Sequence, residues 1–97
     1  GSGPAYIYLV IEALVASAVS QGMPENLALK LAVQTVKGAA LMVEKTGRPP
    51  HVLREEVTSP GGTTAEAIKV LEGREVPKAF ADAVRAAARR SFQLGNQ

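Results

Sequence analysis

The sequence predicts an all-α fold of five helices in one domain. Every long segment of the 97-residue chain carries apolar residues at helical spacing, and no segment shows the alternation typical of a β-strand. Proline and glycine also recur where helices are expected to begin and end. A chain of this length builds only a modest core, so we expect association with a second copy to stabilise it.

The first helix is expected from about Pro4 to Gln21, because proline suits a first helical turn and Gly22 suits a helix end. The apolar run from Ala5 to Val19 could be taken for a membrane span or a signal peptide. It is short for a span, contains Glu12 and follows no basic segment. We therefore interpret it as the buried helix of a soluble, cytoplasmic protein with no membrane partner.

The second helix is expected from Pro24 to Thr46, with Gly47 at its end. Its apolar residues form two stripes, so both of the first two helices are apolar on more than one face. One chain cannot cover them, and we expect an interlocked homodimeric helical bundle. Small residues at 38–40 are compatible with a close helix crossing or with simple tolerance. The stripes are Leu27, Leu31, Gln34, Gly38 and Met42, and Leu29, Val33, Val36 and Ala40.

Three further helices follow. The segment RPPHVLREEV, residues 48–57, predicts a short helix opened by its two prolines. A fourth helix is expected from Thr63 to Leu71, closed by Gly73. Pro77 opens a fifth, which we expect to end near Leu94.

The composition excludes several functions. The chain has no cysteine and one histidine, His51, which leaves no ligands for a thiolate or histidine-cluster metal site. Eleven basic residues against nine acidic ones give a net charge of +2, which does not indicate nucleic-acid binding. We interpret His51 as a surface residue, and Asp82 with Arg85 as a solvated ion pair rather than an anion site.

The segment SPGGTT, residues 59–64, is the candidate site. Thr63 is expected as the N-cap of the fourth helix, with Glu66 completing a capping box. The two preceding glycines have no Cβ atoms to screen the backbone N–H groups, and these groups lie at the positive end of the helix dipole. No lysine follows the glycines, so a small carboxylate or lone phosphate is the expected ligand. A plain structural turn is an equally open interpretation.

These residues resemble a known family. LREEVTSPGGTTAEAIKVLE is similar to the signature of delta-1-pyrroline-5-carboxylate reductase, GSGPAY to its hinge-to-helix motif, and GMPENLALKLAVQTVKGAALM to its next helix. The resemblance covers almost the whole chain in order. It implies an N-terminal Rossmann domain holding NADPH or NADH, followed by a helical domain that interlocks with its twofold partner, with dimers often assembling into rings.

The resemblance also implies roles for individual residues. The turn would bind the carboxylate of 1-pyrroline-5-carboxylate through Ser59, Gly61, Gly62, Thr63 and Thr64, and Thr64 would lie near the imine nitrogen as the catalytic residue. Hydride transfer from the nicotinamide would then give L-proline. We expect Gly62 to matter most for binding, because a side chain there would screen the donors or exclude the backbone conformation.

The sequence departs from the family in one respect. No GxGxxG motif and no βαβ pattern accompany the helices, so residues 1–97 are expected to be the C-terminal dimerisation and substrate-binding domain alone. Such a chain would bind no cofactor and would be inactive by itself. Two alternatives stay open: a stand-alone or designed helical oligomerisation scaffold without catalysis, and a small independent anion-binding domain.

Overall fold

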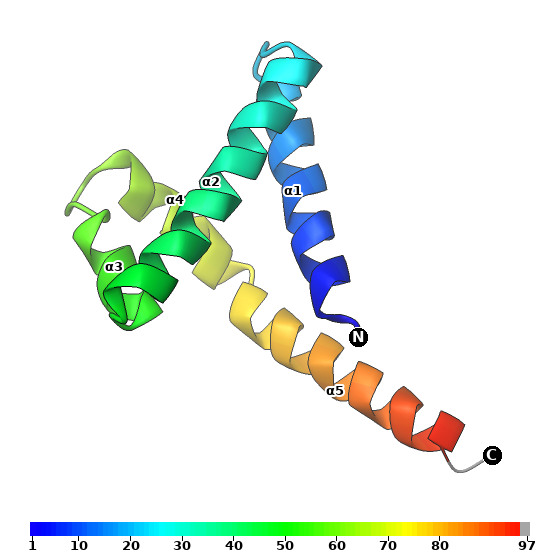
Figure 1. Cartoon of the computed structure of the whole chain (residues 1–97). Coiled ribbons are helices and arrows are strands. Elements are labelled where there is room, and N and C mark those ends of the chain that lie inside the picture. Colours follow the sequence, from blue (N-terminus) through cyan, green and yellow to red (C-terminus); the bar gives the residue numbers. More distant parts are fainter. Residues whose placement is uncertain (96–97) are drawn as a thin grey trace. The chain divides into compact units, whose positions relative to one another are not determined.

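The computed structural model describes residues 1–95, which form five α-helices and no β-strand, so the all-α prediction is confirmed (Figure 1). The chain divides into two compact units, Gly1–Pro50 and His51–Gln97. The helices are α1 (Gly3–Ser20), α2 (Glu25–Thr46), α3 (Pro50–Glu56), α4 (Thr63–Gly73) and α5 (Val76–Gly95).

In the first unit, α1 and α2 form the two arms of a helical hairpin (Figure 1). Pro4 lies in the first turn of α1, where a missing N–H leaves no carbonyl without its donor. Gly47 ends α2 in the left-handed conformation, with φ 66°, and its N–H donates to the carbonyl oxygen of Val43 at 3.1 Å. Proline and glycine thus set these helix ends within one residue of the predicted positions.

The buried core of the described residues consists of Ala28 and Ala32 on α2, whose exposed fractions are 2% and 7%. These alanines lie outside both predicted apolar stripes. Their short side chains let α1 approach α2 closely, which a count of large apolar residues does not detect. A Cβ atom added at Gly38 would meet no neighbouring atom within 4 Å, so the single chain shows no close helix crossing there.

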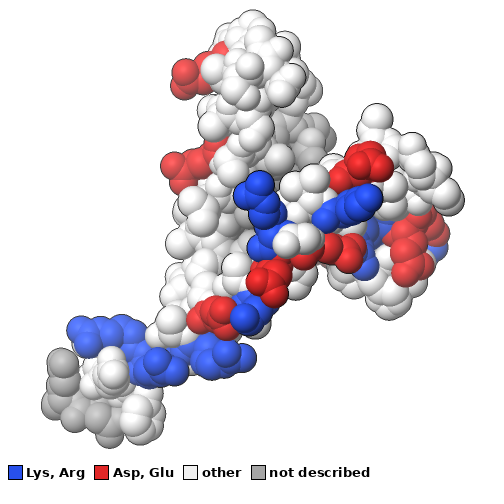
Figure 2. Space-filling view, turned by 180° about the vertical axis from the view of Figure 1, so that it is seen from behind, with Lys and Arg blue, Asp and Glu red and all other residues white. Residues whose placement is uncertain are grey.

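No residue of α1 is buried within the chain. Leu9 and Tyr8 are 66% and 65% exposed, and the hairpin carries few charged side chains in Figure 2. Within the described residues α1 passes a test of length and apolarity for a membrane span, a test that core helices and signal sequences also pass. The expectation of a buried first helix is therefore not met inside one chain, and burial of α1 requires cover from outside it.

The second unit contains α3, α4 and α5. The prediction that Gly73 closes the fourth helix is wrong, because α4 includes Gly73 and Arg74 follows as its C-cap. The left-handed conformation falls instead on Glu75, with φ 56°, and α5 begins at the next residue. His51 is exposed on α3, as expected.

The charged residues of α5 match their interpretation as a solvated face. The guanidinium of Arg85 lies 3.3 Å from the carboxylate of Asp82, and both side chains are largely exposed. An exposed pair of this kind contributes little to stability. Basic side chains gather near the C-terminal end of the described chain in Figure 2.

Candidate functional site

The segment 59–62 forms a tight turn between α3 and α4. The N–H of Gly62 donates to the carbonyl oxygen of Ser59 at 2.9 Å. Pro60 occupies the second position of the turn, and Gly61, with φ 72°, occupies the third. Proline followed by a residue of positive φ is the signature of a type II turn, which reverses the chain just before α4 begins.

The two glycines serve different purposes in this turn. Gly61 adopts a left-handed conformation that costs other residues about 1–2 kcal/mol, although a Cβ there would meet no neighbouring atom within 4 Å. Gly62 has φ −83° and ψ 177°, which any residue can adopt. A Cβ at Gly62 would instead lie 3.1 Å from the carbonyl oxygen of Ser59. The conformational reason predicted for Gly62 therefore belongs to Gly61, and Gly62 is restricted by a close contact.

The predicted capping box is wrong by one residue. Gly62 is the N-cap of α4 and makes no side-chain cap hydrogen bond, whereas Thr63 is already the first helical residue. The carbonyl oxygen of Gly62 accepts the N–H of Glu66 at 3.3 Å, as an N-cap carbonyl does. Glycine is a common N-cap residue although it has no capping side chain. The extended conformation of Gly62 connects the turn to the first residue of α4. Substitution of Thr63 consequently removes no cap.

The N-terminus of α4 presents unpaired backbone donors. Among the described residues, the N–H groups of Thr63, Thr64 and Ala65 donate to no carbonyl oxygen, as the geometry of a first helical turn requires. The N–H of Gly62 is not available, because it closes the turn. Sequence reasoning named the glycines as donors and missed Ala65; counting N–H groups forward from the true N-cap would have found it.

The hydroxyl groups differ in their surroundings. Ser59 and Thr63 are exposed, whereas Thr64 is half-buried, as is Gly62. The structure thus brings the five predicted residues together in one turn and helix start, with Thr64 the most enclosed of the three hydroxyl side chains. Unpaired N–H groups and hydroxyls at the positive end of a helix dipole bind a small anion such as a carboxylate.

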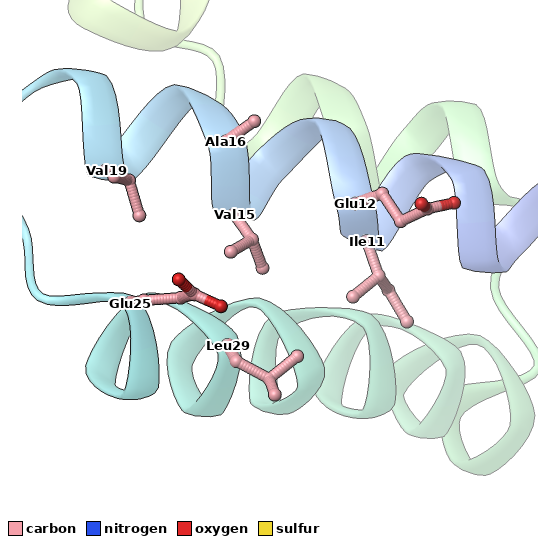
Figure 3. Close-up of a pocket in the computed structure, with 7 residues that line it drawn as sticks. All are labelled: Ile11, Glu12, Val15, Ala16, Val19, Glu25 and Leu29. Carbon is pink, nitrogen blue, oxygen red and sulfur yellow. The ribbon is translucent and has the colours of Figure 1, made fainter.

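In the described part of the chain, neither the groove of the helical hairpin nor the acidic side chains form a second site. A groove of about 420 Å³ lies between α1 and α2, where Val15 and Val19 point toward α2 and the side chain of Glu25 lies between the two helices (Figure 3). Its walls are mainly apolar, and nothing in it indicates a ligand. No group of three metal-binding side chains occurs among the described residues.

The chain is similar to known proteins over almost its whole length. Residues 1–94 match the family model described as pyrroline-5-carboxylate reductase dimerisation. The pyrroline-5-carboxylate reductase of Arabidopsis thaliana is 55% identical over 94 residues, which are 97% of this chain and 34% of the relative. The reductase of Synechocystis is 48% identical over the whole chain and 36% of its own length.

Solved structures of pyrroline-5-carboxylate reductases also match this chain. The pyrroline-5-carboxylate reductase of Coxiella burnetii matches with a TM-score of 0.94 and 48% identity, over 97% of this chain and 35% of that one. The Plasmodium falciparum enzyme, solved with NADP bound, matches with a TM-score of 0.91 and 40% identity, over 94% of this chain and 35% of that one. The chain spans about a third of the length of these relatives. It belongs to the pyrroline-5-carboxylate reductase dimerisation family.

Proposed function

We propose that the chain is the dimerisation and substrate-binding part of a pyrroline-5-carboxylate reductase, which reduces 1-pyrroline-5-carboxylate to L-proline in the cytoplasm. The observation that carries the proposal is the set of unpaired N–H groups at Thr63, Thr64 and Ala65, directly after the type II turn. The turn belongs to a chain whose named relatives are reductases of a small cyclic carboxylate.

The substrate carboxylate is held at the start of α4. Its two oxygens accept hydrogen bonds from the free N–H groups, and the exposed hydroxyl of Ser59 and the N–H of Gly61 add donors from the turn. The dipole of α4 favours the negative charge at this end. Since none of these donors is a charged side chain, the turn also accepts the carboxylate of the product and releases it without breaking an ion pair.

Thr64 acts at the other end of the substrate. In a small ring, the imine nitrogen is adjacent to the carbon that bears the carboxylate, so one helical turn reaches both groups. Thr64 is half-buried, and its own backbone N–H is one of the carboxylate donors. Its hydroxyl forms a hydrogen bond to the ring nitrogen while the imine becomes an amine. Preorganised donors are most effective where charge changes during the reaction.

The described residues do not fit a dinucleotide. They contain no β-strand, and hence no βαβ unit whose glycine-rich turn could hold a pyrophosphate. NADPH or NADH supplies the hydride, and we assign its binding to a part of the reductase outside residues 1–97. The Plasmodium relative solved with NADP supports a nicotinamide cofactor for the family.

The partner of the domain is a second copy of the chain. The exposed apolar surface of α1, together with a core of two alanines, leaves most of the available hydrophobic stabilisation unused in one chain. An interlocked homodimer covers this surface, and dimers then assemble into larger rings. A stand-alone or designed scaffold without catalysis is not favoured, because the turn retains its donors as well as the helices.

The function is tested in the complete reductase by steady-state kinetics with pyrroline-5-carboxylate and either NADPH or NADH. We expect Gly61→Ala to raise KM by about tenfold, because the strain of about 1–2 kcal/mol displaces the turn that positions the carboxylate donors. Gly61→Asn is the matched control, since asparagine tolerates positive φ, and its KM stays closer to that of the wild type. Wild-type protein that reduces no pyrroline-5-carboxylate with either cofactor would contradict the proposed function.

A further inference from the structure

Thr58 lies between α3 and the proposed carboxylate-binding turn. It is hydrogen-bonded to the last turn of α3, and the next residue, Ser59, begins the turn. The hydroxyl of Thr58 donates to the carbonyl oxygen of Arg54 at 2.5 Å, and its N–H donates to the carbonyl oxygen of Glu55 at 3.1 Å. The side chain is half-buried. A threonine hydroxyl that donates four residues back satisfies one of the carbonyl groups left without a partner at the end of a helix.

Hydrogen bonds occur on both sides of the peptide link between Thr58 and Ser59. Thr58 is bonded to α3, the next residue, Ser59, accepts the N–H of Gly62 at 2.9 Å, and the carbonyl oxygen of Gly62 accepts the N–H of Glu66 at 3.3 Å. The turn is thus tied to α4 by Gly62 and to α3 by Thr58. If the hydrogen bonds of Thr58 or of Gly62 are lost, the turn can move relative to the free N–H groups at the start of α4.

An ion pair also joins α3 to α4, and it is weak. The guanidinium of Arg54 lies 3.9 Å from the carboxylate of Glu72, and the two side chains are 50% and 65% exposed. Solvent screens an ion pair at this distance and exposure, so it restrains the helices little. The hydrogen bond of the Thr58 hydroxyl is shorter, at 2.5 Å, and Thr58 is half-buried and adjacent to Ser59, so this bond restrains the start of the turn more than the ion pair does.

Thr58 also faces α4. It lines a cavity of about 220 Å³ together with Arg54, Glu55, Ile68 and Glu72. None of the residues from Ser59 to Thr64 lines this cavity. The influence of Thr58 on substrate passes through the turn and not through contact.

We infer that Thr58 is a positioning residue of the reductase: its hydroxyl holds the Ser59–Thr64 turn in the conformation that binds the substrate carboxylate. The inference rests on the proposed function of that turn. It distinguishes Thr58 from the residues that bind substrate, and it assigns the hydroxyl, rather than the methyl group, as the part that matters.

The experiment compares Thr58→Val and Thr58→Ser in the complete reductase. Valine keeps the shape and removes the hydroxyl, whereas serine keeps the hydroxyl and removes the methyl group. Thr46→Val is the matched control, because the hydroxyl of Thr46 makes the same kind of bond to the carbonyl oxygen of Met42, at 2.6 Å, at the end of α2. That hydroxyl also accepts the N–H of Arg48 at 3.2 Å, so the control loses at least as many bonds.

We expect Thr58→Val to raise KM for pyrroline-5-carboxylate by about tenfold with a smaller change in kcat, since one hydrogen bond that positions the carboxylate site is lost. Thr58→Ser restores KM to within about threefold of the wild type. Thr46→Val lowers the melting temperature to a similar extent but leaves KM unchanged. An equal KM in Thr58→Val and the wild type, or failure of serine to rescue, would overturn the inference.

A second measurement serves if Thr58→Val folds poorly in the complete protein. Hydrogen exchange of the Gly62 amide, which closes the turn, is followed in Thr58→Ser and wild-type protein and in Thr58→Ala. We expect the Gly62 amide to exchange faster in Thr58→Ala than in Thr58→Ser. Equal exchange rates in the two variants would contradict the role assigned to the hydroxyl. If Thr64→Ala lowers turnover while these variants behave like the wild type, the proposed function stands and this inference fails. If wild-type protein reduces no pyrroline-5-carboxylate, both fail.

Discussion

Replacement of Thr64 by alanine is expected to lower kcat/KM for pyrroline-5-carboxylate in the complete reductase by about 10²- to 10³-fold, the cost of one preorganised hydrogen bond in an active site. The physical reason is the position of the side chain. Thr64 is the second residue of α4 and is half-buried, and it adjoins the free N–H groups that we propose as the carboxylate donors. Thr64→Ser keeps the hydroxyl and retains much of the activity.

Thr63→Ala is the comparison for this prediction. Thr63 is adjacent and exposed, and it is not the N-cap, so its loss neither removes a cap nor takes an enclosed donor from the site. We expect less than about a tenfold change in kcat/KM, the effect of one solvent-exposed hydrogen bond, and little change in melting temperature. Steady-state kinetics and thermal unfolding of the three variants give the result. Lost turnover in Thr63→Ala at unchanged stability, with normal turnover in Thr64→Ala, would reverse the two roles.

Replacement of Leu9 by glutamate is expected to weaken the homodimer by at least about 100-fold. Leu9 is 66% exposed in one chain, and around the axis of α1 it lies about 160° from Ile11 and about 120° from Val15, which line the groove against α2. Burial of a leucine side chain contributes about 1.5–3 kcal/mol, and a carboxylate in its place adds a desolvation penalty. The change therefore shifts the equilibrium toward the monomer.

Sedimentation equilibrium of residues 1–97 over a range of micromolar concentrations measures this effect. Wild-type chains are expected at twice the mass of one chain, and Leu9→Glu at or near the mass of one. Ser20→Glu is the matched control, since it adds the same charge to an exposed position of α1 without replacing an apolar side chain. A wild-type chain that is a well-folded monomer would contradict the dimer, and a Leu9→Glu chain as dimeric as the control would place the interface on another face.

Most helix ends could be predicted because they depend on single residues. Pro24, with its fixed φ, precedes the first residue of α2, and Gly47 ends the helix in the left-handed conformation. Both effects are local. The end of α4 could not be predicted in the same way, since Gly73 continues the helix and Glu75 takes the left-handed conformation at a cost that glycine would not incur. The order of the next few residues, and not the glycine alone, decides where the helix stops.

The core and the fine geometry of the site depend on neighbours that periodicity does not show. Ala28 and Ala32 are buried because small side chains let α1 approach, whereas the predicted stripes followed large apolar residues. The turn was found from its glycines, but the pattern Thr-x-x-Glu fits a capping box whether or not Thr63 is the cap. Only the backbone shows that Gly62 is the cap and that its N–H closes the turn.

The most direct test is the position of the carboxylate of L-proline in a crystal structure of the complete reductase. The proposed function predicts carboxylate oxygens about 2.7–3.2 Å from backbone N–H groups of Thr63, Thr64 and Ala65, with the ring nitrogen within the same distance of the Thr64 hydroxyl. L-Prolinamide, which lacks the charge, should not occupy the site under the same conditions. A carboxylate bound elsewhere, with these N–H groups facing solvent, would contradict the account.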